Sequence, residues 1–242
     1  MIPGRKTRKD SIETEVLIDA GKVNLEGTLA LPKSASGLVL FAHGSGSSRH
    51  SPRNRYVADI LQSQGIATLL FDLLTHEEES VDQYTAELRF DIGLLAARLI
   101  GATRWVLGRP DMKGVRLGYF GASTGAAAAL VAAAQLPDAI AAVVSRGGRP
   151  DLAADALGSV RAATLLIVGG DDEPVIGMNR EALAKLRCPE KKLVIIPGAT
   201  HLFEEPGKLE EVARVAADWF ARYLATPEKS QARMSSVATK LA

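Results

Sequence analysis

The 242-residue chain contains a single cysteine, Cys188, and few aromatic residues, which make up 5% of the sequence. One cysteine excludes an internal disulfide framework and fits a reducing compartment, so we expect a cytoplasmic protein. The net charge is only +1, and the basic residues do not gather into a face interleaved with aromatic side chains. Because such a face is the usual footprint of nucleic-acid binding, no nucleic-acid partner is expected.

The sequence also lacks long apolar runs and clusters of metal-binding residues. No apolar run reaches the roughly 18 residues that span a bilayer, and no apolar segment follows the basic residues at 5–9 as it would in a secretion signal. The chain has four histidines, and none combines with Cys, Asp or Glu at metal-ligand spacing. We therefore expect no membrane partner, no metal and no cofactor, and the sequence leaves the oligomeric state open.

Hydrophobic residues make up 47% of the chain, and their pattern alternates between two periods. Short apolar runs predict buried strands, and longer stretches with helical spacing predict the helices between them. The expected strands cover 38–42, 67–71, 115–120, 140–145, 163–168 and 192–196, and the expected helices cover 55–64, 85–107, 123–136, 177–186 and 208–224. This alternation is typical of an α/β fold with a mostly parallel sheet and helices on both faces.

Two earlier strands, 15–19 and 22–31, are expected to form an antiparallel hairpin at the sheet edge. We expect one domain over 15–225, with an N-terminal tail at 1–14 and a flexible C-terminal tail at 226–242. The connections are too short to hold a large cap domain.

One serine lies between two glycines where an apolar run meets an alanine-rich run. Gly121, Ser123 and Gly125 follow the strand expected at 115–120 and precede the helix expected at 123–136. Glycines two residues before and after the serine allow the sharp turn of a nucleophile elbow, which lifts the hydroxyl clear of the sheet. We therefore expect Ser123 to be a catalytic nucleophile.

A serine hydroxyl is a weak nucleophile near neutral pH and needs a base within hydrogen-bond reach. His201 lies in the loop after the last expected strand, at the carboxyl edge where open parallel sheets place their sites. We expect His201 to be this base. His43 stands directly before a glycine-rich loop and is expected to fix that loop by hydrogen bonding.

The base in turn needs an acid that orients it. The strand expected at 163–168 runs into the segment 169–175, Gly-Gly-Asp-Asp-Glu-Pro-Val, which offers three carboxylates. The spacing favours Asp172 as the partner of His201, with Asp171 as an alternative. Asp171 and Glu173 are better suited to capping the helix that follows.

An acyl-transfer site also needs two donors for the oxyanion. One is expected to be the backbone N–H of Thr124, the residue after the serine. The other is expected from the glycine-rich loop after the strand at 38–42, with Ser45 favoured and Gly44 and Gly46 as alternatives. A phosphate-binding role for this loop is disfavoured, because it has neither the Gly-Lys-Ser/Thr ending nor the Gly-x-Gly-x-x-Gly helix opening of nucleotide-binding loops.

The chain resembles the α/β-hydrolase superfamily over about 16–224. The resemblance rests on the order Ser123, Asp172, His201, on the His43-Gly44 loop and on the strand–helix alternation. The motifs Gly-Ala-Ser-Thr-Gly and Gly-Gly-Asp-Asp-Glu-Pro-Val, without a cap, are similar to its dienelactone hydrolase branch. The segment 43–55 resembles a compact subgroup whose members can occur joined to phosphoribosyltransferase domains.

The resemblance implies a cofactor-free serine hydrolase that works through an acyl-enzyme. Dienelactone hydrolases proper have cysteine at the elbow, whereas this chain has Ser123. We therefore expect a carboxylesterase acting on small to medium acyl esters rather than a dienelactone specialist. Lactone, thioester or carbon–carbon bond hydrolysis by the same triad remains an alternative, as does a catalytically silent scaffold that binds a ligand or protein.

Several arginines lie in loops expected to border the site. We hypothesise that one or more of them, with Arg53 and Arg146 foremost, bind a carboxylate or phosphate on the substrate. Surface solvation, or ion pairing with the acidic residues at 77–79, is the alternative. The set comprises Arg49, Arg53, Arg55, Arg146 and Arg149.

Overall fold

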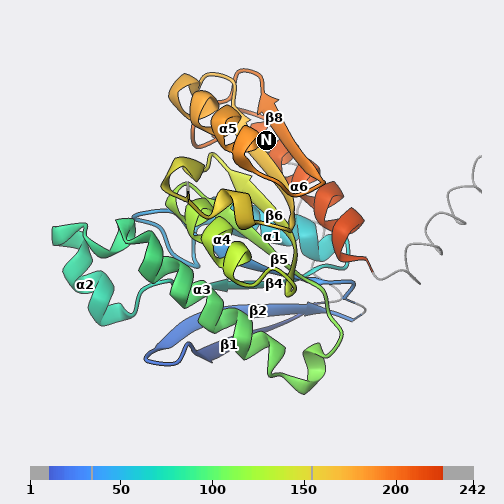
Figure 1. Ribbon diagram of the computed structural model, residues 1–242. Coiled ribbons are helices and arrows are strands. Elements are labelled where there is room, and N and C mark those ends of the chain that lie inside the picture. The colour runs from blue at the N-terminus through green and yellow to red at the C-terminus, as the bar shows by residue number, and fades with distance from the viewer. Residues whose placement is uncertain (1–10, 34, 154, 226–242) are drawn as a thin grey trace, which may run out of the picture.

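A computed structural model describes residues 11–33, 35–153 and 155–225 of the chain. Within these residues eight strands form one sheet in the order β1-β2-β4-β3-β5-β6-β7-β8 (Figure 1). Strands β3 to β8 run parallel, and β1 and β2 form an antiparallel hairpin along one edge, as predicted. The strands are β1 Ser11–Asp19, β2 Asn24–Pro32, β3 Leu38–Ala42, β4 Ala67–Phe71, β5 Leu117–Ala122, β6 Ile140–Arg146, β7 Ala163–Gly169 and β8 Lys191–Ile196.

Helices cover both faces of the sheet, which confirms the predicted layers (Figure 1). Helices α3, α4 and α5 pack on one face, and α1 and α6 pack on the other. The helices are α1 Pro52–Ser63, α2 His76–Thr85, α3 Ile92–Leu107, α4 Thr124–Gln135, α5 Glu173–Lys185 and α6 Lys208–Leu224. Every residue of β3, β4, β5 and β7 is buried, because helices cover both sides of these strands.

Strand β1 begins at Ser11, four residues before the expected strand start at Glu15, so the predicted tail at 1–14 overlaps it. Ser11 to Thr14 pair with Leu29 to Pro32 of β2. This end of β1 lies on the sheet edge with most of its side chains exposed, so its sequence resembles a polar tail. The rest of the predicted N-terminal tail and the C-terminal tail at 226–242 lie outside the described residues.

The single helix predicted at 85–107 is wrong in its first turns. Helix α2 ends at Thr85, a short 3₁₀ turn follows at Leu88–Phe90, and α3 begins after Asp91, whose side chain accepts the N–H of Leu94 at 2.9 Å. The buried carboxylate of Asp82 accepts the backbone N–H groups of the turn and stabilises the break.

Helix α2 itself falls in a segment predicted to be a loop. Its start carries a reciprocal capping box, in which the Thr75 hydroxyl accepts the N–H of Glu78 and the Glu78 carboxylate accepts the N–H of Thr75. The Thr-x-x-Glu spacing was a readable signal for this helix start. In Figure 1, α2 projects from the body of the domain at the end of the sheet where β1 and β2 lie.

None of the helices described here is both long enough and apolar enough to cross a membrane.

Candidate active site

Ser123 occupies a strained turn between β5 and α4. Its backbone angles are φ 51° and ψ −119°, a conformation that non-glycine residues rarely adopt. The flanking glycines make the turn sterically possible, because a Cβ on Gly121 would lie 2.4 Å from the Cα of Ala126. A Cβ on Gly125 would lie 2.2 Å from the carbonyl oxygen of Ala42. The predicted strand, turn and helix are therefore present with the geometry of a nucleophile elbow.

The end of β6 braces the elbow on one side. The N–H of Ser123 donates to the carbonyl of Arg146 at 3.3 Å, and the carbonyl of Ser123 accepts the N–H of Arg149 at 3.2 Å. These bonds tie both sides of the serine peptide to one neighbouring loop, which helps to hold the strained conformation.

Asp172 and His201 are in direct contact. The Asp172 carboxylate lies 2.7 Å from Nδ1 of His201, so Nδ1–H donates to the carboxylate and Nε2 is left to accept a proton. Asp172 stands at the N-cap position of α5 but makes no capping bond with its side chain. Its carboxylate orients the histidine instead of stabilising the helix.

The loops that carry these two residues are joined through their backbones. The N–H of Gly170 donates to the carbonyl of Ile196 at 2.8 Å, and the N–H of Asp171 donates to the carbonyl of Ala199 at 3.0 Å. A Cβ on Gly169 would lie 2.3 Å from the same Ala199 carbonyl, so only glycine allows this approach. The contact between Asp172 and the histidine follows from this pairing. Asp171 itself is exposed.

Gly147 lies between the elbow and the histidine. A Cβ at this residue would lie 3.5 Å from Cε1 and from Nδ1 of His201, and the neighbouring Arg146 bonds the serine N–H. Across the described part of the chain, the structure has no hydrogen bond between the Ser123 hydroxyl and His201. Such catalytic pairs are often loose before substrate binds.

The two predicted oxyanion donors meet at the start of α4. The N–H of Ser45 donates to the side-chain hydroxyl of Thr124 at 3.0 Å. The N–H of Thr124 belongs to the first turn of α4, where backbone donors have no helical acceptor. Sequence reasoning gave Thr124 a role through its backbone alone, and the contact between its side chain and Ser45 was missed.

His43 anchors the glycine-rich loop, as predicted. Its Nε2 accepts the N–H of Leu73 at 3.1 Å, and its Nδ1–H donates to the carbonyl of Gly44 at 3.0 Å. The bond in which Nε2 accepts requires the neutral ring. Burial lowers the pKa of His43, and this effect exceeds the opposing influence of the Gly44 carbonyl and of Asp72. The loop therefore rests on a buried, uncharged histidine.

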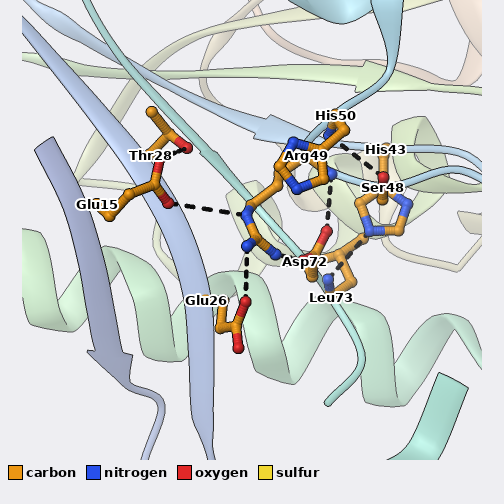
Figure 2. A network of polar contacts seen from close by, with 9 residues as sticks. All are labelled: Glu15, Glu26, Thr28, His43, Ser48, Arg49, His50, Asp72 and Leu73. Carbon is orange, nitrogen blue, oxygen red and sulfur yellow. Dashed lines mark hydrogen bonds and ion pairs between the residues drawn. The ribbon is translucent and has the colours of Figure 1, made fainter. Parts of the chain in front are cut away.

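Arg49 holds the far end of the same loop (Figure 2). Its guanidinium pairs with Asp72 and with Glu26, the latter at 2.6 Å. The backbone N–H of Arg49 also donates to the Asp72 carboxylate, at 2.7 Å. Glu15 of β1 lies 4.0 Å from the same guanidinium. Sequence analysis grouped Arg49 with the possible substrate-binding arginines and overlooked Asp72, although Asp72 directly follows β4 at the catalytic edge of the sheet.

A cleft of about 510 Å³ opens beside this loop. It is lined by residues 46–49 on one side and by Asp72, residues 74–77 and Glu79 on the other. Residues 74–79, of which 76–79 begin helix α2, therefore form one wall of this cleft. The lining mixes polar and apolar groups, and it includes the acids Glu26, Asp72, Glu77 and Glu79 together with Arg49.

The predicted arginines divide into two groups. Arg49, Arg53 and Arg149 pair with carboxylates other than those at 77–79, Arg53 with Glu204 at 2.7 Å, and Arg55 is exposed. Arg146 differs from all of these because it is buried and its Nε and Nη1 have no hydrogen-bond partner. The structure brings Arg146 close enough to Arg53 for the charge of Arg53 to lower the pKa of Arg146, an effect second to that of burial.

Comparison with known proteins places these features in context. The sequence profile of the dienelactone hydrolase family matches residues 25–228. A crystal structure of a dienelactone hydrolase from Anabaena variabilis is 61% identical, with a TM-score of 0.87 over 89% of this chain and 99% of that one.

Two curated Mycobacterium tuberculosis proteins, whose names carry a provisional phosphoribosyl transferase assignment, are 58% identical over 220 residues. The match covers 90% of this chain but only 48% of theirs, so the chain spans about half the length of these relatives. A lid-less α/β serine hydrolase from Xanthomonas campestris shares 23% identity and a TM-score of 0.71 over 93% of this chain and 100% of that one, which shows a common fold.

We expect Gly125→Ala to disrupt the elbow. The new methyl group would meet the carbonyls of Ala42 and His43 at 2.2 and 2.4 Å, so β3 or α4 must move. Unfolding in urea should show a loss of about 3 kcal/mol, the upper part of the usual overpacking range. Gly177→Ala, in α5 with open space around it, is the control and should stabilise the protein by about 0.5–1 kcal/mol. Equal stability of the two variants would contradict this account.

We expect the stability contributed by His43 to depend on pH. Since its folded-state pKa lies below the ordinary value of 6.5, the unfolded chain binds the extra proton first as the pH falls. The contribution is therefore complete above pH 6.5 and declines as the pH drops from there towards the folded-state pKa. Urea unfolding at about pH 7.5 and about pH 5.5 should show a smaller loss for His43→Gln than for the wild type. An identical loss would show that His43 does not titrate in this way.

Proposed function

This chain belongs to the dienelactone hydrolase family, and on that premise we propose that it is a serine hydrolase that cleaves carboxylic esters of small to medium acyl groups. The observation that carries the proposal is the 2.7 Å contact between Asp172 and His201 at the sheet edge that also holds the strained Ser123 turn. These three residues supply a nucleophile, a base and an orienting acid, which is what acyl transfer requires.

In the proposed reaction the hydroxyl oxygen of Ser123 attacks the ester carbonyl while Nε2 of His201 takes its proton. The tetrahedral intermediate collapses as His201 returns that proton to the leaving alkoxide, which departs as an alcohol. A water molecule then attacks the acyl-enzyme with His201 again as base, and the carboxylic acid is released. Asp172 stays ionised throughout and stabilises the imidazolium that forms in each half of the reaction.

The oxyanion is proposed to bind to the backbone N–H groups of Thr124 and Ser45. Both donors lie at the start of α4, whose positive dipole end also favours the developing negative charge. The N–H of Ser45 now donates to the Thr124 hydroxyl, and in the proposed reaction it donates to the oxyanion instead. His43 and Arg49 support the reaction by holding the loop that carries Ser45.

Serine at position 123 favours ester hydrolysis over the chemistry of family members with a cysteine nucleophile. The same triad can also open lactones and cleave thioesters, so a panel of 4-nitrophenyl esters, thioesters and lactones defines the scope of the reaction. We propose a cytoplasmic location, because Cys188 is the only cysteine of the chain.

We expect a fluorophosphonate probe to label Ser123 stoichiometrically, because such probes react with activated serines. Mass spectrometry of the tryptic peptide would locate the adduct. Ser123→Ala should abolish both the labelling and the hydrolysis of 4-nitrophenyl esters. A folded wild-type protein whose Ser123 stays unmodified would rule out a serine hydrolase.

We expect Asp172→Asn to lower kcat on the order of a thousandfold, because an amide cannot stabilise the imidazolium or fix its tautomer. The neighbouring Asp171→Asn is the matched control, since Asp171 is exposed and contributes only its backbone N–H to the site. Its kcat should stay within about threefold of the wild type, as for other exposed substitutions. Similar, mild losses in both variants would mean that Asp172 is not the catalytic acid.

A further inference from the structure

Arg146, the last residue of β6, is a buried cation without an anion. Its exposed fraction is 7%, and its Nε and Nη1 atoms are buried with no hydrogen-bond partner. A guanidinium carries five N–H donors, and leaving a buried charge unpaired is strongly destabilising. A folded protein tolerates such a group when a ligand supplies the missing acceptor.

Arg98 shows how this fold treats a comparably buried arginine. Its exposed fraction is 8%, and Glu78 approaches its Nη2 to 2.5 Å. Arg89, which is less buried, has the carboxylate of Asp82 at 2.6 Å from its Nε. Arg146 therefore stands apart from these arginines because no carboxylate of the described residues is paired with it.

The charges around Arg146 increase this imbalance. The charged group found to act on it is a second cation, Arg53 of α1, and burial together with this repulsion lowers the pKa of Arg146 to about 10. Arg146 is therefore still charged near neutral pH. Arg53 has Glu204 at 2.7 Å from Nη1, but its own Nε is buried without a partner. Both guanidinium groups thus present unpaired donors, and only Arg53 has a carboxylate partner.

The position of Arg146 connects these donors to the catalytic centre. Its carbonyl accepts the N–H of Ser123 at 3.3 Å, and it lies opposite Ala122 in the register of β5 and β6. The next residue, Gly147, packs against the ring of His201. Arg146 follows Ala142 and Val144 at alternate positions of β6, which places its side chain on the α1 and α6 face of the sheet, and Arg53 of α1 is the cation that acts on its charge.

We propose that Arg146, with Arg53 beside it, forms an oxyanion-binding subsite that takes a carboxylate or phosphate group carried by the ester substrate. The inference rests on the proposed function, since it assigns a substrate class to the same Ser123 site. Both ligand groups are planar or tetrahedral sets of oxygen acceptors that match a guanidinium fork. The small exposed fraction of Arg146 favours a single terminal group over an extended polyanion.

A binding experiment tests the subsite without any need for catalysis. Ser123→Ala protein is titrated with inorganic phosphate and, separately, with acetate, at constant ionic strength, and its thermal unfolding is followed. We expect saturable stabilisation by at least one anion, and the stronger of the two identifies the ligand group as phosphate or carboxylate. No saturable stabilisation by either anion would overturn the proposal, and a buried water would then account for the unpaired donors.

Variants assign the binding to the subsite. Arg146→Gln in the Ser123→Ala background should weaken anion binding by about tenfold or more, the usual effect of losing a charged hydrogen bond. The control Arg161→Gln removes an exposed arginine that pairs with Asp138 and should bind as before. Without anion, Arg146→Gln should unfold at or above the temperature of its parent, because it relieves an unpaired charge. A lower unfolding temperature together with unchanged anion affinity would show a structural role instead.

Arg53→Gln provides a second route if Arg146→Gln does not fold. This variant removes the neighbouring donors while Arg146 remains in place, so anion affinity should fall by about threefold or more. Unchanged affinity in Arg53→Gln, with Arg146→Gln unfolded, would count against the two-arginine subsite.

Kinetics separates failure of the subsite from failure of the proposed function. The substrates are 4-nitrophenyl pentanoate, which is neutral, and the mono-4-nitrophenyl ester of succinic acid, which carries a carboxylate at the end of a similar acyl chain. The ratio of kcat/KM for the anionic to the neutral ester should fall about tenfold or more in Arg146→Gln. Hydrolysis of both esters with an unchanged ratio overturns the subsite and leaves the hydrolase intact. Anion binding without hydrolysis of any ester overturns the hydrolase and leaves the subsite intact.

Discussion

The site depends on backbones that touch with no side chain between them. At the carboxyl edge of the sheet, Gly125 meets the end of β3, and Gly169 meets the loop after β8. A Cβ on Gly125 would lie 2.2 Å from a carbonyl oxygen of the facing segment and a Cβ on Gly169 2.3 Å, so either side chain would force the two segments apart. The strained conformation of Ser123 persists because these contacts fix its neighbours on every side. The geometry of the Ser123 turn and of the Asp172–His201 pair thus depends on close packing between main chains.

The charged residues around this edge follow two different arrangements. On the β1 and β2 side, Arg49 is paired with Asp72 and Glu26, and the loop that carries Ser45 is held by bonds internal to the protein. On the α1 and α6 side, Arg146 has no internal acceptor. The first arrangement maintains geometry whether or not a ligand is bound. The second leaves donors open, which is the basis of the anion subsite proposed above.

Much of this arrangement could be predicted from the sequence because it follows from local periods and from topology. Strands β3 and β4 have the predicted bounds, and the contact between Asp172 and His201 was predictable because parallel strands bring their following loops to one edge. Where local composition was misleading, prediction failed: Ser11 to Thr14 resemble a polar tail because β1 is an edge strand. Helix α2 has little apolar character, and only its capping box marks it.

Other features could not be read from the sequence, since they depend on which distant groups meet. The six-residue spacing from Arg49 to Arg55 gives no sign that Arg49 and Arg53 find carboxylates more than twenty residues away, or that Arg146 finds none. The bond from Ser45 to the Thr124 hydroxyl joins residues 79 positions apart. Burial and pairing of polar groups are properties of the assembled fold, and no local stretch of sequence contains them.

That last bond has a consequence for selectivity between ground state and transition state. Without substrate, the backbone N–H of Ser45 donates to the neutral hydroxyl of Thr124, so this donor already has an acceptor. An ester carbonyl is also neutral, so a hydrogen bond from Ser45 to that carbonyl is little stronger than the bond to the Thr124 hydroxyl that it replaces. An oxygen that has become an anion forms a much stronger bond and wins the exchange. In the proposed mechanism the threonine hydroxyl thus offsets part of the binding energy of the substrate but not that of the intermediate, which is the difference on which catalysis depends.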